Sequence, residues 1–268
     1  MLNGDKIAFY MNILITNRCH MNCPHCMEDA TPDGRHMTEE TFSKVLELVE
    51  EAQPLVVNVS GGEPTENPLW EFFVKELLKT SGVMIVSLVT NGAWIEDKKT
   101  RLAVASLKRF HKDRFFIQVY SNPAYYQDHE WTVDHEAQFR SIGCIADFDS
   151  PIESMQDLGR ARANCVAETM ESKHVPSCIN SHLLAVQSRS LQHFLSMAAQ
   201  TGKVCRPTID VDGGIHMSES RLCPSVAHVS DGAEEIFSKM RDSRPCKGCR
   251  LYKNFERLHP LEMKVLKL

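Results

Sequence analysis

Long apolar runs are missing from this chain of 268 residues, and so is any excess of basic side chains. A transmembrane helix needs about 18 or more consecutive apolar residues, and no such stretch occurs. The segment Met1–Asn12 lacks a basic region followed by an apolar one, so we expect no signal peptide and a cytoplasmic protein. With 30 Lys and Arg against 35 Asp and Glu, the net charge of −5 argues against a partner that is duplex nucleic acid.

Internal repeats and low-complexity segments are also absent from the sequence. Hydrophobic residues make up 43% of the chain, which is enough for a full core and excludes wholesale disorder. What the chain has in unusual number is cysteine, with ten in total. Without an export signal, cysteines in a chain of this length are expected in metal or redox chemistry rather than in a disulfide framework.

The ten cysteines fall into three groups. The first group is close together in the segment 19–26 and consists of Cys19, Cys23 and Cys26. The second group occupies the last quarter of the chain and consists of Cys205, Cys223, Cys246 and Cys249. The remaining three are scattered, and we expect buried thiols there because free cysteine packs as a small apolar residue: Cys144, Cys165 and Cys178.

Apolar segments alternate with helical patterns in the first half of the chain. Helices are predicted from a Thr38 cap, from Pro68 after an Asn67 cap, and over about 96–110. Strands are predicted at 11–15, 55–59, 83–89 and 115–120. Because these strands look apolar throughout rather than alternating, the pattern indicates a parallel sheet covered by helices. We therefore expect an α/β fold, either an open doubly wound sheet or a (βα) barrel.

A polar motif follows each of the four predicted strands. In parallel α/β folds the chemistry lies at the carboxyl ends of the strands. We therefore expect the four motifs to line one mouth: Cys19–Cys26, Gly61–Pro64, Thr90–Gly92 and Ser121–Pro123.

The pattern is harder to interpret beyond about residue 124. The segment 125–135 is polar and aromatic, and it either faces a substrate or packs its aromatic rings on the fold. A helix is predicted over 190–200 and a hairpin over 208–217. We place a boundary near residue 200, between a core of residues 1–200 and a small cysteine-bearing extension of residues 201–268.

Cys19-x3-Cys23-x2-Cys26 is a spacing that folds a loop around one metal centre. Three thiolates suit a four-iron cluster that keeps one iron open for a further ligand. This segment resembles the hallmark C-x3-C-x-Φ-C of the radical S-adenosylmethionine (radical SAM) superfamily, with His25 at the aromatic Φ position. The glycine-rich turn Gly61–Pro64 resembles the second signature of that superfamily. The resemblance covers about residues 8–200 and implies a partial (βα)6 TIM-like barrel with a small cysteine-rich C-terminal extension.

The resemblance also implies a set of residues that bind SAM. Gly61 and Gly62 would let the backbone approach the ligand, Glu63 would lie near the SAM ammonium, and Arg160 would bind its carboxylate. The whole set is His25, Gly61, Gly62, Glu63, Pro64, Asn91, Ser121 and Arg160. A reduced [4Fe-4S] cluster would cleave SAM to methionine and a 5′-deoxyadenosyl radical, which abstracts hydrogen from a substrate. An electron donor such as flavodoxin or ferredoxin is the implied partner.

Simpler interpretations exist for each of these motifs. The cysteine trio also fits a structural zinc ion with His20 or His25 as the fourth ligand. Gly61–Pro64 and Thr90–Gly92 are each, taken alone, ordinary turn sequences. Arg160 is equally a surface arginine at the start of a helix.

The four C-terminal cysteines resemble those of SPASM and twitch extensions, which bind auxiliary four-iron clusters. Because this copy is short, the resemblance implies one second [4Fe-4S] cluster. A structural zinc held by Cys205, Cys223, Cys246 and Cys249 is the alternative. Two further arrangements stay open: Cys178 replaces one of the four, or only three of them ligate.

The implied activity is that of a radical SAM enzyme acting on a peptide, in the maturation of ribosomally made peptides, or on a small metabolite. The modest size and acidity favour such substrates over nucleic acid. A small-molecule or nucleotide-modifying enzyme is one alternative. A non-catalytic scaffold that binds an iron–sulfur cluster or zinc is the other.

Overall fold

A mostly parallel sheet of eight strands forms the centre of the computed structural model, which describes residues 11–120, 133–147, 159–164, 178–201, 206–217, 221 and 223–243. The strand order is β5-β4-β3-β2-β1-β6-β7-β8, and the sheet is open within the described residues. The bounds are β1 Met11–Thr16, β2 Val56–Gly61, β3 Ile85–Thr90, β4 Phe115–Tyr120, β5 Ile145–Asp147, β6 Thr208–Ile209, β7 Gly214–His216 and β8 Ser225–His228. The predicted α/β class is confirmed.

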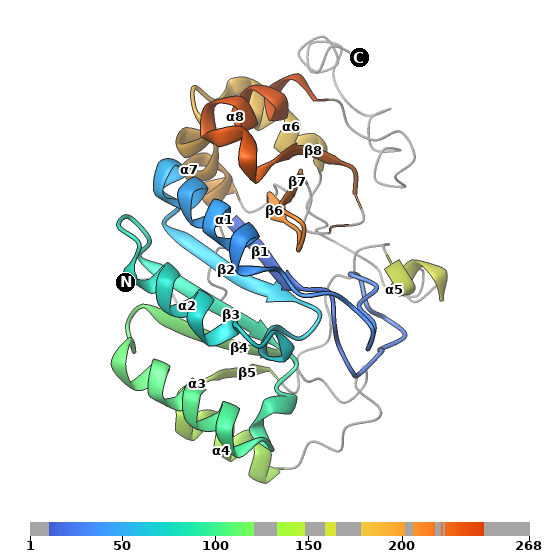
Figure 1. Ribbon diagram of the computed structural model, residues 1–268, viewed down its shortest axis with the longest axis vertical. Helices are drawn as coiled ribbons and strands as arrows, with labels where there is room; N and C mark the ends of the chain where they lie inside the picture. Colours follow the sequence, from blue (N-terminus) through green and yellow to red (C-terminus); the bar gives the residue numbers. More distant parts are fainter. Residues whose placement is uncertain are drawn as a thin grey trace.

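Helices join consecutive strands along one side of this sheet (Figure 1). These are α1 Glu39–Ala52, α2 Trp70–Lys79, α3 Lys98–Phe110 and α4 Val133–Ile142. The later helices are α5 Gly159–Ala163, α6 Cys178–Gln187, α7 Leu191–Thr201 and α8 Gly232–Asp242. Short 3₁₀ turns occur at η1 Pro64–Glu66, η2 Ala93–Ile95 and η4 Val229–Asp231. No helix among the described residues is long and apolar enough to cross a membrane.

One predicted helix start is confirmed by the structure and another is wrong. The Thr38 cap of α1 is confirmed, since its hydroxyl accepts a hydrogen bond from the Thr41 amide at 3.1 Å. The Asn67 cap is wrong, because α2 begins only at Trp70. Asn67 is buried instead, and its side-chain amide donates to the Ile15 carbonyl at 2.7 Å. A residue predicted to start a helix therefore ties the turn after β2 to β1.

The sequence predicts strands that are apolar on both faces, and the structure shows that this prediction is wrong for one of the two faces. On one face, Ile13, Val57 and Leu88 are fully buried and join Phe42 and Phe73 of the helices in the core. The opposite face carries one row of neutral polar side chains, with one residue from each of five strands, and we call it the polar face: Asn12, Asn58, Ser87, Gln118 and Thr208. Apolar residues such as Leu14, Val56 and Ile85 occupy other positions of the same face, which is why the sequence shows no regular alternation.

The C-terminal segment joins the same sheet. β6 pairs with β1 in parallel, with Asn12 opposite Thr208, and β6 and β7 form the predicted antiparallel hairpin. α8 packs against α1 and α6. Strands from before and after the predicted boundary near residue 200 therefore belong to the same sheet. The division into two domains stays a prediction.

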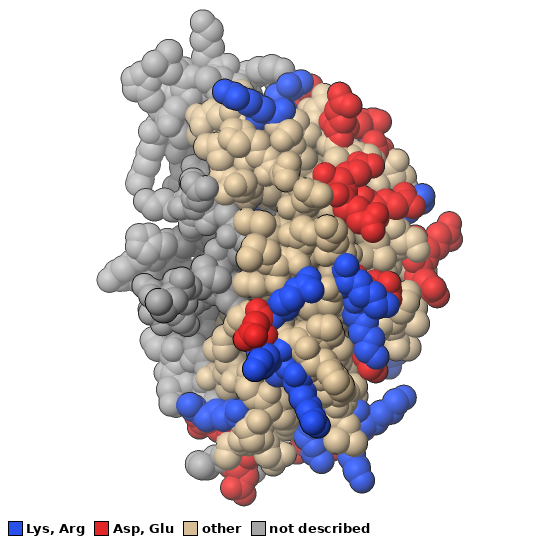
Figure 2. Space-filling view, turned by 90° about the vertical axis from the view of Figure 1, so that its left-hand side faces the viewer, with Lys and Arg blue, Asp and Glu red and all other residues tan. Residues whose placement is uncertain are grey.

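Charge is unevenly distributed on the side of the molecule that lies on the left of Figure 1. Figure 2 shows this side with acidic side chains most numerous at its upper right and basic ones most numerous in its lower half, although some of each sign occur in both parts. The helix sequences agree, since α1 contains five glutamates and α3 contains five lysines and arginines. The net charge of −5 is therefore not spread evenly, since α1 is acidic and α3 is basic.

Candidate functional site

The cysteine trio lies in the loop that follows β1, at the carboxyl edge of the sheet. Cys19 is buried, whereas Cys23 and Cys26 are half-buried. The Cys26 amide donates to the Cys23 carbonyl at 3.2 Å, which closes a tight turn between these two residues. Asn91, which follows β3, reaches the same loop. The structure therefore brings together the motifs that follow β1, β2 and β3.

Two of the three sulfur atoms accept N–H hydrogen bonds. The Ala30 amide lies 3.3 Å from Cys26 Sγ, and the Asn91 side-chain amide lies 3.7 Å from Cys19 Sγ. Burial raises the pKa of the Cys19 thiol to about 12. A thiolate at this position therefore needs a positive partner, and the N–H donors are placed to stabilise the charge of a sulfur bound to iron.

The donor set fits an iron–sulfur cluster by its chemistry, because three thiolates are soft ligands on one short loop. Among the described residues, no three His, Cys, Asp or Glu side chains converge closely enough to hold a single metal ion. A cluster spreads its ligands over several iron atoms, so its thiolates need not meet at one point. The loop as folded thus contains no single-ion site in its described part.

Gly61 and Gly62 permit a close approach between two backbones. Gly61 has φ +140°, and a Cβ there would lie 2.1 Å from the Thr16 carbonyl oxygen. A Cβ on Gly62 would lie 2.1 Å from the Arg18 carbonyl oxygen. These glycines are therefore required by the start of the cysteine loop itself. Their predicted approach to a ligand stays a prediction.

Glu63 is 1% exposed and joins the turn after β2 to the end of β3. Its carboxylate accepts hydrogen bonds from the Thr65 hydroxyl at 2.6 Å, the Thr90 hydroxyl at 2.8 Å and the Asn91 amide at 2.9 Å. Burial raises the pKa of this carboxyl above its usual value, and the hydrogen bonds offset only part of that effect. Pro64 follows as the first residue of η1 and is buried. Whether Glu63 lies beside an ammonium group stays a prediction.

Arg160 holds the cysteine loop from α5. Its Nε donates to the Cys23 carbonyl at 2.9 Å, and its Nη2 donates to the Ala30 carbonyl at 2.6 Å. Its Nη1 donates to Asp29 at 2.9 Å, and its backbone amide donates to the Cys26 carbonyl at 3.0 Å. The guanidinium thus spans the loop from Cys23 to Ala30. The predicted contact with a SAM carboxylate stays a prediction.

Two other residues at and just after α5 also lie against the backbone of the cysteine loop. Gly159 has φ +56°, and a Cβ there would lie 2.6 Å from the Cys26 carbonyl oxygen. The Asn164 side chain donates to the Pro24 carbonyl at 2.8 Å. Burial and the nearby Arg160 lower the pKa of His25, so its ring is neutral near pH 7. Residues 159–164 therefore form a brace against the cysteine loop.

Glu66 fixes the start of the loop and was missed by the sequence analysis. Its carboxylate accepts from the His20 amide at 3.0 Å and lies 2.5 Å from His20 Nδ1. Arg18 Nε lies 3.4 Å from the same carboxylate. The sequence shows only an acidic residue two positions after the Gly61–Pro64 turn, which does not indicate its partner.

The C-terminal cysteines can be placed only in part. Cys205, Cys246, Cys249 and Ser121 lie outside the described residues, as do Cys165 and residues 121–132. Cys223 is half-buried, and its carbonyl oxygen lies 2.5 Å from His216 Nδ1. Cys178 begins α6, and Cys144 is a buried thiol as predicted. The second metal centre stays a prediction.

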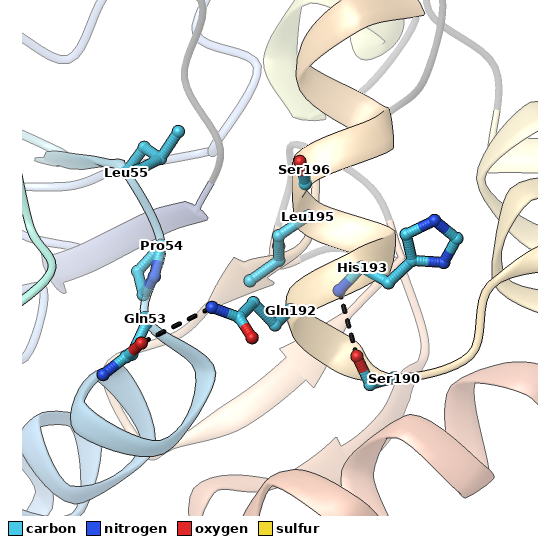
Figure 3. Close-up of a pocket in the computed structure, with 8 residues that line it drawn as sticks. All are labelled: Gln53, Pro54, Leu55, Ser190, Gln192, His193, Leu195 and Ser196. Atoms are coloured by element: carbon cyan, nitrogen blue, oxygen red, sulfur yellow. Dashed lines mark hydrogen bonds between the residues drawn. The ribbon is translucent and has the colours of Figure 1, made fainter.

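A cavity of about 340 Å³ lies at the other end of the sheet (Figure 3). Its walls include Pro54 and Leu55, which precede β2, and Ser190 and His193 at the start of α7. Gln192 and Gln53 meet across it at 3.4 Å. Because it adjoins the amino end of β2, this cavity is separate from the cysteine loop.

Comparison with known proteins agrees with this arrangement. Residues 13–150 match the family model described as the radical SAM superfamily. A GTP 3′,8-cyclase of Peptoclostridium acidaminophilum is 32% identical over 104 residues, which cover 37% of this chain and 32% of that protein. A 7,8-dihydro-6-hydroxymethylpterin dimethyltransferase of Methanocaldococcus jannaschii is 33% identical over 95 residues, covering 34% of this chain and 18% of that protein. The first of these matches thus spans about a third of the relative's length.

Two solved structures share the fold. Native anSMEcpe with bound AdoMet and Cp18Cys peptide aligns with a TM-score of 0.51 at 13% identity, over 91% of this chain and 86% of its own. BtrN in complex with AdoMet and 2-DOIA aligns with a TM-score of 0.50 at 12% identity, over 94% of this chain and 87% of its own. Since the family model spans more than half of the sequence, this chain belongs to the radical SAM superfamily.

Proposed function

We propose that this protein is a radical SAM enzyme that cleaves SAM reductively and abstracts hydrogen from a substrate. The superfamily implies a [4Fe-4S] cluster and SAM, and we assign the cluster to Cys19, Cys23 and Cys26. The observation that carries this assignment is the short loop of three thiolates at the carboxyl edge of the sheet, with N–H donors on two of its sulfurs. The glycine turn and α5 support it, because both are shaped against that loop.

Cys19, Cys23 and Cys26 would hold the cluster, which would supply the electron needed to cleave SAM to methionine and a 5′-deoxyadenosyl radical. The chain's own residues bind and orient. Asn91 and the Ala30 amide stabilise charge on the sulfurs, and Arg160 fixes the loop between Cys23 and Ala30. We further propose that SAM is bound by residues around this loop: His25, Gly61, Gly62, Glu63, Pro64, Asn91, Ser121 and Arg160.

We propose a second centre, a [4Fe-4S] cluster or zinc, at Cys205, Cys223, Cys246 and Cys249 in a SPASM-like or twitch-like extension. The support is the number and spacing of these thiols, together with the contact that holds the Cys223 carbonyl against His216. The electron donor we propose is a flavodoxin or ferredoxin. Iron, sulfide and zinc are measured in a variant that lacks the three cysteines of the first loop. About four irons per chain support a second cluster, and zinc supports a structural zinc site.

The proposed substrate is a peptide or a small metabolite. Relatives named GTP 3′,8-cyclase favour a nucleotide-sized small molecule as the second candidate. The resemblance to these relatives covers only about two fifths of the chain or less, so it supports SAM chemistry more strongly than a particular substrate.

The experiment uses anaerobically reconstituted protein with a strong reductant, and it measures 5′-deoxyadenosine. Wild-type protein is expected to form it, and Cys23→Ala is expected to form none and to lose about four irons per chain. Cys144→Ala is the matched control, since it removes a buried thiol away from the loop. SAM cleavage that survives in Cys23→Ala, or its absence in wild-type protein, refutes the proposal.

A further inference from the structure

A one-sided charge lies on α3 and on the residues that follow it. Residues 98–114 contain seven basic side chains and one acidic side chain, Asp113, although the whole chain has a net charge of −5. The seven basic residues are Lys98, Lys99, Arg101, Lys108, Arg109, Lys112 and Arg114. A local excess of positive charge on an acidic protein indicates a surface that attracts an anionic partner.

These seven side chains also lack the carboxylate partners that most other lysines and arginines of the described residues have. Lys44, for example, pairs with Glu47 at 2.9 Å on α1. Within the described residues, no carboxylate oxygen lies at ion-pair distance from any of the seven. Arg101, Lys108 and Arg114 donate to backbone carbonyls at 2.6–2.7 Å, so they serve the fold itself. The other four are exposed, and their charge is available to a partner.

The exposed residues of α3 gather on one side of the helix. At 3.6 residues per turn they fall within about a third of its circumference. Val104 and Leu107, on the other side, are buried in the core. We call the exposed side the basic face of α3, and its residues are Lys98, Lys99, Leu102, Ser106, Arg109 and Phe110.

Two large apolar side chains lie among the cations of the basic face. Leu102 is 60% exposed and Phe110 is 76% exposed. Exposed apolar groups with charges around them are typical of protein interfaces, where aromatic side chains contribute much of the binding energy. Nucleic acid would use only the cations, because its contacts are mainly to phosphate. The basic face is therefore suited to a protein that has an acidic surface.

The basic face begins at the edge of the sheet that holds the cysteine loop. β3 ends at Thr90, and the side-chain amide of Asn91, the next residue, lies 3.7 Å from Cys19 Sγ. The chain then forms the short turn η2 and begins α3 at Lys98. A protein that binds the first turns of α3 is therefore held at the edge to which we assign the cluster.

These observations identify one kind of partner, and the inference rests on the proposed function, which needs an electron from outside the chain. We propose that the basic face of α3 is the docking surface for an acidic electron-carrier protein. In each encounter the reduced carrier loses one electron, which is taken up at the site of Cys19, Cys23 and Cys26, and no bond forms or breaks. Electron-transfer partners use small interfaces, below about 1,200 Å². A helix of 13 residues, about 20 Å long, suits such a contact.

The test compares three electron sources for anaerobically reconstituted protein: flavodoxin, ferredoxin and dithionite. The product measured is 5′-deoxyadenosine. Dithionite is a small ion that needs no docking surface, so it separates docking from SAM cleavage. The double variant Lys98→Glu with Lys99→Glu is expected to raise the KM for the carrier that supports cleavage by about tenfold or more. Its rate with dithionite is expected to stay within about twofold of wild type, because glutamates are compatible with the first turn of a helix.

A matched variant controls for net charge. Lys44→Glu makes the same change of sign at an exposed position of α1, and it is expected to alter the KM for the carrier by less than about twofold. Phe110→Ser keeps the charge of the basic face, and it is expected to raise that KM by about threefold or more. Added salt is expected to raise the KM of wild-type protein more than that of the double variant.

Two results overturn the proposal: a KM that is unchanged in the double variant, or cleavage that dithionite supports while neither carrier does. Binding to phosphatidylglycerol vesicles and to duplex DNA is measured alongside. If the double variant loses either of these while its KM is unchanged, the basic face belongs to that other partner. If wild-type protein forms no 5′-deoxyadenosine even with dithionite, the proposed function itself is refuted.

Discussion

The helix-covered face of the sheet buries Ile13 and Val57 against Phe73, whereas the same strands present Asn12 and Asn58 on the polar face. Both sets are buried, but they differ in what satisfies them. The apolar set needs only close packing, which the helices supply. The polar set needs partners in defined directions, and it leaves one acceptor without any. Packing therefore stabilises the fold mainly through the helix-covered face, while the polar face depends on hydrogen bonds in defined directions.

The largest expected loss of stability is on the helix-covered face. Phe73 is fully buried and stacks on Phe42 with ring centroids 3.9 Å apart, so Phe73→Ala is expected to lower the free energy of unfolding by about 3–5 kcal/mol. Its neighbour Phe72 is 39% exposed and provides the control, with an expected loss of about 1 kcal/mol. Urea unfolding measures both. Equal losses would contradict the idea that packing on this face carries the stability.

The next effect depends on pH. His182 of α6 is 3% exposed, and burial lowers its pKa to about 4. The unfolded chain takes up this proton near pH 6.5, so the free energy of unfolding is expected to fall by about 3 kcal/mol from pH 6.5 to 4. It is at its full value above pH 6.5.

Urea midpoints across this range compare wild-type protein with His182→Gln. The variant is expected to lose less stability on acidification, because no buried imidazole has to take up a proton. Its Ser243 contact at 3.0 Å is within reach of a glutamine amide, which keeps the packing of α6 on α8 similar. Identical pH profiles would show that His182 is not the group responsible.

The smallest expected change in global stability is at the carboxyl edge. Arg160→Lys replaces a planar fork with one ammonium group, so most of its hydrogen bonds to the cysteine loop are lost. The free energy of unfolding is expected to fall by about 1 kcal/mol. Amide hydrogen exchange over residues 23–30 of the metal-free protein is nevertheless expected to accelerate by about tenfold.

Arg140→Lys is the matched control for this substitution. Arg140 pairs with Glu136 on the exposed side of α4, so its replacement leaves the loop unchanged. Similar exchange in both variants would contradict the role of α5 as a brace. Faster exchange only in Arg160→Lys would show that the order of the cysteine loop depends on contacts with α5 rather than on the stability of the core.

Local patterns in the sequence predicted much of the core of this fold. Each of β1 to β4 is a short and mostly apolar run, and each follows or precedes a helix with its own cap, such as Thr38. The cysteine trio and Gly61–Pro64 were also visible, because their spacing is local. Their common location follows from parallel strands, whose carboxyl ends share one edge.

What the sequence did not predict depends on contacts between distant segments. Arg160 reaches Cys23 across 137 positions, and Glu66 reaches His20 across 46. Neither contact has a local signal, because a single arginine or glutamate is compatible with many surfaces. Asn67 was misassigned for the same reason, since its partner Ile15 lies 52 positions earlier. Side chains that shape a loop are thus harder to predict than those that start a helix.

The pairing of β1 with β6 has a consequence for synthesis. β1 can pair with β2 early, but its other edge meets Thr208 only after 196 further residues have been made. Until then the mostly apolar strand Met11–Thr16 keeps one row of its backbone N–H and C=O groups without a partner strand. Such an edge is a template for pairing with another chain. The emerging polypeptide is therefore most prone to aggregate before its C-terminal third leaves the ribosome, and slower translation of that third prolongs the exposure.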